Sequence, residues 1–172
     1  NKLATHFVAD QPAASLVKRL EDNFLASGGD LKSLYRTLIE SPESWDVKAV
    51  KFKSPWDWTI SAMRATGMKR LPDRLKIGQL QQQLGQPVWQ PGSPAGFADR
   101  KEQWAGSVAI MRRFELANRF ARLSANGVDA RQLAVHLLGD RLTQNTAQVI
   151  ARAESPEQGL ALLLVSPEFM RR

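Results

Sequence analysis

The chain has 172 residues, of which 43% are hydrophobic and 24% are charged, and it carries a net charge of +7. These values are typical of one globular domain with a core of its own. The absence of cysteine excludes disulfide bonds. The longest apolar run, residues 160–165, is too short to cross a bilayer, so we expect no transmembrane segment. Acidic residues interrupt the basic ones throughout, which argues against nucleic acid as a partner.

The first part of the chain predicts helices separated by Pro, Gly and Asp. Leu16, Leu20 and Phe24 recur every four residues and predict a helix that starts near Pro12. Two glycines end this helix, and Asp30 is a typical N-cap for the next one.

A Ser-Pro-Glu motif followed by an aromatic residue ends two of the predicted helices, at residues 41–45 and 166–169. Proline forces the chain out of the helix, and Ser or Glu can cap the next segment. We therefore interpret Glu43 and Glu168 as structural residues and not as catalytic acids.

A Ser-Pro pair at residues 54–55 predicts the start of another helix, with Trp56, Ile60 and Met63 on one face. Residues 47–52 before it alternate in polarity. We interpret them as an extended connector and not as a strand, because no partner strand is evident elsewhere.

A Gly/Pro-rich loop, residues 85–99 with the sequence GQPVWQPGSPAGFAD, follows a helix predicted over residues 72–84. Its prolines and glycines prevent a helix or a central strand from running through it. The loop nevertheless carries two large aromatic residues, Trp89 and Phe97, which a solvated linker would lack. Either these aromatic residues pack the loop onto the helices beneath it, or they line a groove for a ligand or partner.

One long helix is predicted over residues 101–125, with Asp99 as its N-cap. Its apolar residues follow two lines, one through Val108 and the other through Phe114. A helix this broadly apolar is covered on two sides, so we expect it to be central. The whole pattern predicts an all-α, irregular multi-helix fold of about eight or nine helices, with residues 1–172 forming a single domain.

Few residues suggest catalysis or metal binding. Neither His6 nor His136 has a second histidine at helical spacing. His6 and Asp10 share a helix face, but surface or capping roles are commoner for such a pair. The sequence contains no phosphate-binding loop, dinucleotide fingerprint or Gly-x-Ser-x-Gly elbow. We expect no metal and no cofactor, and we assign no catalytic residue.

The candidates for a ligand site lie in and around the loop. Aromatic faces with Arg and Asp nearby suit sugar rings or a peptide strand, through stacking and charge-assisted hydrogen bonds. The same residue types also suit an arginine buried beneath the loop and held by a carboxylate. The candidate ligand-binding residues are Trp89, Phe97, Asp99, Trp104, Arg112 and Arg64.

An ordered set of motifs carries a resemblance to a known family. The motifs are THFVAD with a Pro two residues on, GGDLKSLYRTLIESPESW, K-x-K-S-P-W-D-W, R-A-T-G, LGQPVWQP with a later Gly-Phe, a helix with Trp104, Arg112 and Asn118, and a terminal LLLVSPEFMRR. Across essentially the whole chain, this set resembles the C-terminal part of a bacterial family known as domain of unknown function 1800. The chain departs from the family in having Phe97 where the family tends to have Trp, and Gly92 where it tends to have Pro.

The resemblance implies a helical protein that is commonly exported, to the periplasm or beyond, and often encoded near a second exported family related to sulfatases. It implies no established activity, substrate or catalytic residue. Full family members are longer, and Asn1 opens in the middle of a helical pattern. We therefore expect a C-terminal fragment without a signal segment of its own, whose first partner is the missing N-terminal part of the same protein.

Two functional hypotheses of different classes remain. In the first, the chain is a non-catalytic helical module of a larger exported bacterial protein, and it binds a carbohydrate or protein partner through residues 85–99. In the second, the chain is the C-terminal part of a hydrolase whose catalytic residues lie mostly outside this fragment. Whether the whole protein is an enzyme stays open at this point.

Overall fold

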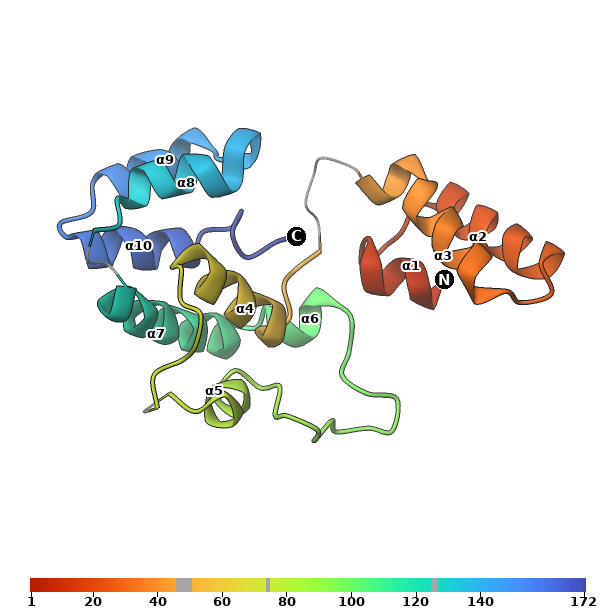
Figure 1. Ribbon diagram of the computed structural model, residues 1–172, viewed down its shortest axis with the longest axis horizontal. Coiled ribbons are helices and arrows are strands. Elements are labelled where there is room, and N and C mark those ends of the chain that lie inside the picture. The colour runs from red at the N-terminus through yellow and green to blue at the C-terminus, as the bar shows by residue number, and fades with distance from the viewer. Residues whose placement is uncertain (46–50, 74, 125–126) are drawn as a thin grey trace. The chain divides into compact units, whose positions relative to one another are not determined.

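The computed structural model (Figure 1) describes residues 1–45, 51–73, 75–124 and 127–172. In this described part the chain forms ten α-helices, two short 3-10 helices and no β-sheet, which confirms the all-α prediction. The chain divides into two compact units, Asn1–Lys51 and Phe52–Arg172, and each unit is described by itself. The single domain predicted over the whole chain stays a prediction.

The first unit consists of three α-helices and one 3-10 turn. α2 packs against α3, and Asp30 caps α3 as predicted, because its carboxylate accepts hydrogen bonds from two backbone N–H groups of the first turn. The buried apolar residues of this unit are Ala4, Leu16, Leu20 and Leu38. The helices are α1 (Lys2–Phe7), α2 (Ala14–Ala26), α3 (Leu31–Glu40) and the 3-10 turn η1 (Pro42–Trp45).

Glu43 joins the end of α3 to α2. Its carboxylate accepts hydrogen bonds from the two terminal nitrogens of Arg19, at 2.9 and 3.2 Å, and from Ser15 Oγ at 2.7 Å. The Arg19 guanidinium, with help from the Ser15 hydroxyl, lowers the pKa of Glu43 to about 2. Arg19 also donates to Ser41 Oγ at 2.9 Å. The first Ser-Pro-Glu motif therefore fastens one helix to another.

The second unit is built around its last helix, α10. In Figure 1, α10 lies between α7 and the pair formed by α8 and α9, and it packs against all three. Its buried residues Leu160, Ala161, Leu163 and Leu164 form the middle of the core. The helices are α4 (Pro55–Ala65), α5 (Ile77–Gln83), α6 (Lys101–Trp104), α7 (Ser107–Ser124), α8 (Ala130–Leu138), the 3-10 turn η2 (Gly139–Arg141), α9 (Gln144–Ala151) and α10 (Pro156–Leu164).

Glu168, in the second Ser-Pro-Glu motif, makes a similar link. Its carboxylate accepts hydrogen bonds from Thr143 Oγ1 at 2.6 Å and from Thr146 Oγ1 at 2.9 Å. Burial favours a higher pKa for Glu168, but the hydrogen bonds from the two threonines and from its own backbone N–H together outweigh burial and lower the pKa. Because Thr143 is the N-cap of α9, this carboxylate fastens the chain after α10 to the start of α9.

Trp58 holds α4 against the core. Its Nε1 donates a hydrogen bond to Leu164 O at 2.9 Å, and its ring meets the ring of Phe120 edge to face, with centroids 5.9 Å apart. The buried face of α4 is therefore the one that contains Trp58, Thr59 and Ala62. This is not the face through Trp56 that the sequence singles out.

The helix predicted over residues 101–125 is interrupted, so that prediction is wrong in its first part. α6 ends at Trp104, and α7 begins after Gly106, because glycine is a poor helix former and permits the change of direction. Asp99 is not the N-cap of α6, since Arg100 occupies that position and no side chain caps this helix. The split helix is one reason why the described part has more helices than about eight or nine.

α7 is covered on one side and not on two. The covered side packs along α10 and near α4. The residues buried on it are Arg113, Leu116, Ala117, Phe120 and Ala121. The apolar residues that stay exposed on this helix are Val108, Met111 and Phe114.

The C-terminal residues pack against the segment that begins the second unit. Phe52 pairs with Arg171 in an isolated antiparallel bridge, so the last residue of the predicted connector has a partner after all. Residues 47–50 of that connector lie outside the described part. Arg113 is 1% exposed. Its Nη2 donates to Lys53 O at 2.8 Å, and its guanidinium lies 4.7 Å from the centroid of the Phe52 ring.

Lys53 occupies a place that is unfavourable for a charge. Its Nζ lies 4.2 Å from the centroid of the Phe169 ring. Burial, helped by the nearby positive charges of Arg141 and Arg113 and opposed by Asp57, lowers the pKa of Lys53 to about 8. Burial likewise lowers the pKa of Arg113 to about 10. Two partly desolvated cations are thus built into the second unit.

We expect Glu43→Gln to weaken the first unit at neutral pH and to have little effect in acid. A carboxyl group whose pKa is lowered in the folded state stabilises that state above its ordinary pKa of 4.5, and the stabilisation is lost as the pH falls towards about 2. Hydrogen-exchange mass spectrometry of peptides covering residues 14–45, near neutral pH and in acid, measures this. Glu40→Gln, at an exposed position of α3, is the matched control, and an equal loss of protection at both pH values would contradict the role of charge.

We expect Lys53→Met to stabilise the second unit most at neutral pH. Because the pKa of Lys53 is about 8 in the folded state and 10.5 ordinarily, the unfolded chain binds the proton more tightly, and wild-type stability rises with pH between these values. The free energy of unfolding of the Met variant should therefore exceed that of the wild type by roughly 2 kcal/mol less at the top of this pH range than at its bottom. Urea denaturation followed by tryptophan fluorescence measures the change, with the exposed Lys69→Met as control. An advantage that does not depend on pH would refute the charge argument.

Candidate functional site

The loop of residues 85–99 forms turns but no helix or strand, and it joins α5 to α6 (Figure 1). Its first part is tied to two neighbouring helices. Gln86 N–H donates to Gln81 O at 2.9 Å, and Gln86 Oε1 accepts a hydrogen bond from Trp56 N–H at 2.9 Å. Arg112 of α7 donates to Gln83 O at 2.9 Å, just before the loop begins. The start of the loop is therefore fixed by α4, α5 and α7 together.

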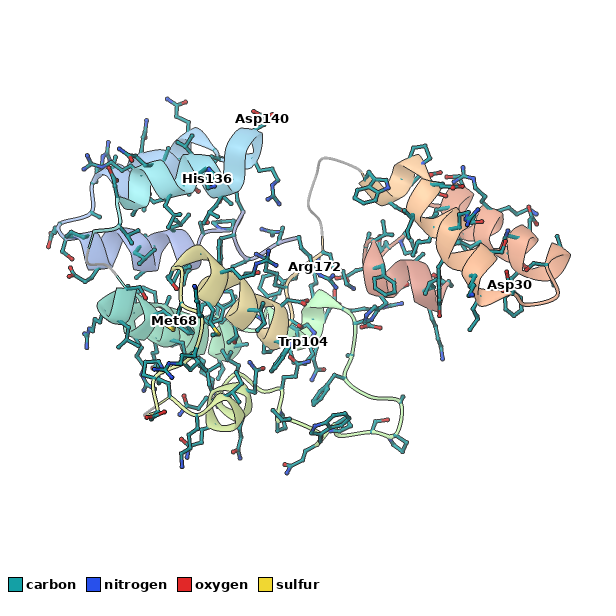
Figure 2. The ribbon with its side chains drawn as sticks, viewed as in Figure 1. Asp30, Met68, Trp104, His136, Asp140 and Arg172 are labelled. Atoms are coloured by element: carbon teal, nitrogen blue, oxygen red, sulfur yellow. The ribbon has the colours of Figure 1, made fainter. Side chains whose placement is uncertain are left out.

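Trp104 and Phe97 fix the other end of the loop. Trp104, labelled in Figure 2, is 3% exposed, and its Nε1 donates to Ala98 O at 3.0 Å. The rings of Phe97 and Trp104 have centroids 6.2 Å apart and are inclined by 51°. These two aromatic residues therefore pack the loop onto the helices beneath it, in agreement with the first of the two alternatives for the loop.

Trp89 behaves in the opposite way. Its side chain is 94% exposed. Gln90 N–H donates to Pro87 O at 3.3 Å, which closes a turn with Trp89 in its third position. The φ angle of Trp89 is 59°. The third position of a turn with positive φ is usually taken by glycine, because a side chain there is strained. The structure thus holds a large indole out of the core at a strained turn position.

Of the other candidate residues, Arg112 lies on α7 and Arg64 on α4. Arg112 is exposed and bonds to the backbone at the end of α5, and Arg64 is exposed in the last turn of α4. Asp99 is exposed next to the start of α6. The six candidates therefore do not all meet in one place. Phe97 and Trp104 meet, whereas Trp89 stands apart from both.

The buried arginine is Arg113 and not Arg112, a difference of one residue that the sequence pattern does not resolve. Arg113 Nη2 binds the carbonyl of Lys53. Its Nη1 lies 3.4 Å from the sulfur of Met170. The second unit does bury an arginine, but its hydrogen bonds go to Lys53 and Met170, so it holds the C-terminal segment and not the loop.

A groove that sequence reasoning missed lies between α4 and the start of α5. Its volume is about 550 Å³. Because Trp56 lines this groove and its backbone N–H binds Gln86, the groove wall and the start of the loop are directly joined. The signal in the sequence is that α4 has apolar residues on both sides. The lining residues are Trp56, Ile60, Met63, Leu71, Pro72, Asp73, Leu75, Lys76 and Ile77.

A second hollow, of about 510 Å³, lies between the start of α8, the end of α9 and the start of α10. Its polar groups serve the fold. Asp129 caps α8 by accepting from Arg131 N–H at 2.9 Å, and Arg131 Nη2 donates to Ala151 O at 2.9 Å. Because these groups already bond within the unit, the hollow is explained by the way the helix ends meet.

The described residues contain no group of three or more His, Cys, Asp or Glu side chains that could hold a metal ion. His6 and Asp10 do not share a helix face as expected, because α1 ends at Phe7. Asp10 Oδ1 accepts a hydrogen bond from Lys51 Nζ at 2.7 Å. In the same described part, no helix is long and apolar enough to cross a membrane.

The family described as Protein of unknown function (DUF1800) matches residues 1–171, essentially the whole chain, and the chain belongs to this family. The resemblance stated from the sequence motifs is thereby confirmed. No curated protein and no solved structure matches the chain.

We expect the two tryptophans of this region to differ sharply in their contribution to stability. Trp104→Ala should lower the free energy of unfolding by roughly 3–5 kcal/mol, because it empties a buried site. Trp89→Ala should change it by less than about 0.5 kcal/mol, because little buried surface is lost. Urea denaturation of each variant measures this, with Trp104→Phe as a milder core control. A large loss for Trp89→Ala would mean that the indole packs on the protein in solution.

Proposed function

We propose that this chain is a binding module of a larger exported bacterial protein, and that it engages a protein partner through the loop of residues 85–99. The single observation that carries the proposal is the 94% exposure of Trp89 on a loop that is fixed at both ends. Membership of an uncharacterised family supports no finer statement by itself. Export and a periplasmic location rest on what the family resemblance implies.

The energetics of Trp89 favour binding over a purely structural role. An indole exposed to water contributes nothing to the core, yet it can bury a large apolar area against a partner, and tryptophan is prominent among the residues that dominate protein interfaces. Because Gln86 and Trp104 already hold the ends of the loop, less conformational entropy is lost when a partner binds the tip. The loop therefore resembles a preorganised binding element.

The surroundings of Trp89 favour a protein partner over a carbohydrate. From Gln86 to Ala98 the loop has no charged side chain, and the neighbours of Trp89 are Val88 and Gln90. Sugar recognition needs several hydrogen-bonding side chains around a flat aromatic face. Phe97, the other aromatic residue of the loop, already packs against Trp104. One indole between apolar and amide groups suits an apolar pocket on another protein.

The alternative that the chain is part of a hydrolase stays a prediction. It places the catalytic residues mostly outside this chain, so the described residues neither support it nor argue against it. The binding proposal and the hydrolase hypothesis are also compatible, because a binding module can be attached to a catalytic domain.

We expect a screen of displayed random peptides and of a glycan panel against this chain to yield peptide ligands that depend on Trp89. Trp89→Ala should weaken their binding by about tenfold or more, because an indole at the centre of an interface contributes at least about 1–2 kcal/mol. Biolayer interferometry with purified ligands measures the change. Val149→Ala, at an exposed apolar position of α9, is the control. Ligands that are all glycans would favour the carbohydrate alternative, and peptide ligands unaffected by Trp89→Ala would refute the role of the loop.

A further inference from the structure

We infer that the α4–α5 groove, lined by Trp56, Ile60 and Met63 of α4 and by residues 71–73 and 75–77, binds an apolar peptide segment flanked by acidic residues. This inference rests on the proposed function, because it specifies the chemistry of the partner that the neighbouring loop would contact. Three observations carry it: the two apolar faces of α4, the link between groove and loop, and the charge around the groove.

α4 has one apolar face more than its own unit covers. Trp58 and Ala62 face the core and are fully buried. Trp56 and Ile60, on another side of the helix, line the groove instead, and Met63 both lines the groove and packs partly against the core. Trp56 is 46% exposed and Ile60 is 36% exposed. Burying such side chains stabilises a complex in proportion to the apolar area removed from water, so the face offers a site for apolar side chains of a partner.

One wall of the groove is bonded to the start of the loop that carries Trp89. The hydrogen bond from Trp56 N–H to Gln86 Oε1, at 2.9 Å, places the groove wall next to the residue with which the loop begins. Trp89 follows Gln86 by three positions in the chain. An extended segment gains about 3.3 Å per residue, so a short peptide can occupy the groove and reach the loop together.

The charge of the surrounding residues selects the kind of peptide. Lys76 and Asp73 line the groove itself. Further basic side chains, all exposed, come from the last turn of α4 and from the residues that lead to Leu71: they are Arg64, Lys69 and Arg70. Among the described residues here, these four basic side chains outnumber two acidic ones, Asp73 and Asp57, and Asp57 is already paired with Arg172 at 3.3 Å. A positive rim around an apolar floor favours a partner whose apolar residues are flanked by Asp or Glu, and it disfavours a basic one.

The test uses fluorescein-labelled synthetic peptides with Leu and Phe at fixed positions and either Glu, Lys or Ser at the flanks. Fluorescence anisotropy with the full chain measures their affinities. The Glu peptides should bind about tenfold more tightly than the Lys peptides at low salt, and the difference should narrow as the salt concentration rises. Equal affinities for the Glu and Lys peptides, or failure of every peptide to bind, would overturn the inference.

Two variants localise the binding to the groove. Ile60→Gln keeps a good helix former but makes the floor polar, and it should weaken the Glu peptides by about tenfold. Lys76→Glu, at an exposed position, should remove most of the preference for acidic flanks. Lys32→Glu, at an exposed position of α3 in the other unit, is the matched control for the change in net charge. Glu peptides that bind both groove variants as tightly as the wild type would refute the site.

The outcome for Trp89→Ala separates this inference from the proposed function. If Trp89→Ala weakens the Glu peptides and Ile60→Gln does not, the loop binds the partner and the groove inference fails. If Ile60→Gln weakens them and Trp89→Ala does not, the groove inference holds and the proposed role of the loop fails. A urea denaturation curve for each variant shows that the chain is folded in every case.

Discussion

The packing of Trp58 fixes the rotation of α4, and most of what is distinctive about the second unit depends on it. Its indole N–H binds the carbonyl of Leu164, and its ring meets Phe120. Because a buried indole N–H needs a partner, this arrangement turns one side of the helix to the core and leaves the side with Trp56 facing outward. That rotation places the Trp56 side chain in the wall of the groove and directs the Trp56 backbone N–H towards Gln86.

The all-α fold and several helix ends could be predicted because they depend on local chemistry. Asp30, Ser54 and Thr143 cap helices through short-range hydrogen bonds, which sequence spacing reveals. The break at Gly106 and the covered side of α7 could not be predicted. Helical periodicity tells which residues share a face, but the choice between two apolar faces is made by distant partners such as Leu164. The same limit explains why the face through Trp56 was identified while its exposure was not.

The irregular loop of residues 85–99 could be predicted from the sequence, but the arrangement of its aromatic side chains could not. The loop and its two aromatic residues were recognised, because Gly and Pro exclude regular structure there. What the sequence could not decide is that Phe97 and Trp89 take opposite roles. Both are large aromatic residues in the same loop, and the difference arises from Trp104, whose indole binds Ala98 O and packs near Phe97. Arg113 illustrates the same limit, because a shift of one residue along α7 exchanges a buried arginine for an exposed one.

The strained backbone at Trp89 strengthens the case that the exposed indole has a role. A left-handed residue other than Gly, Asn or Asp is costly, and such outliers persist where the surrounding structure holds them and often where function needs them. A glycine at this position would satisfy the turn without strain, and Gly85 and Gly96 show that the loop uses glycine at its other positive-φ positions. Trp89 buries only a small part of its surface in compensation, since it is 94% exposed. The stabilisation that would offset its strain is therefore to be sought in a contact outside the fold of this unit.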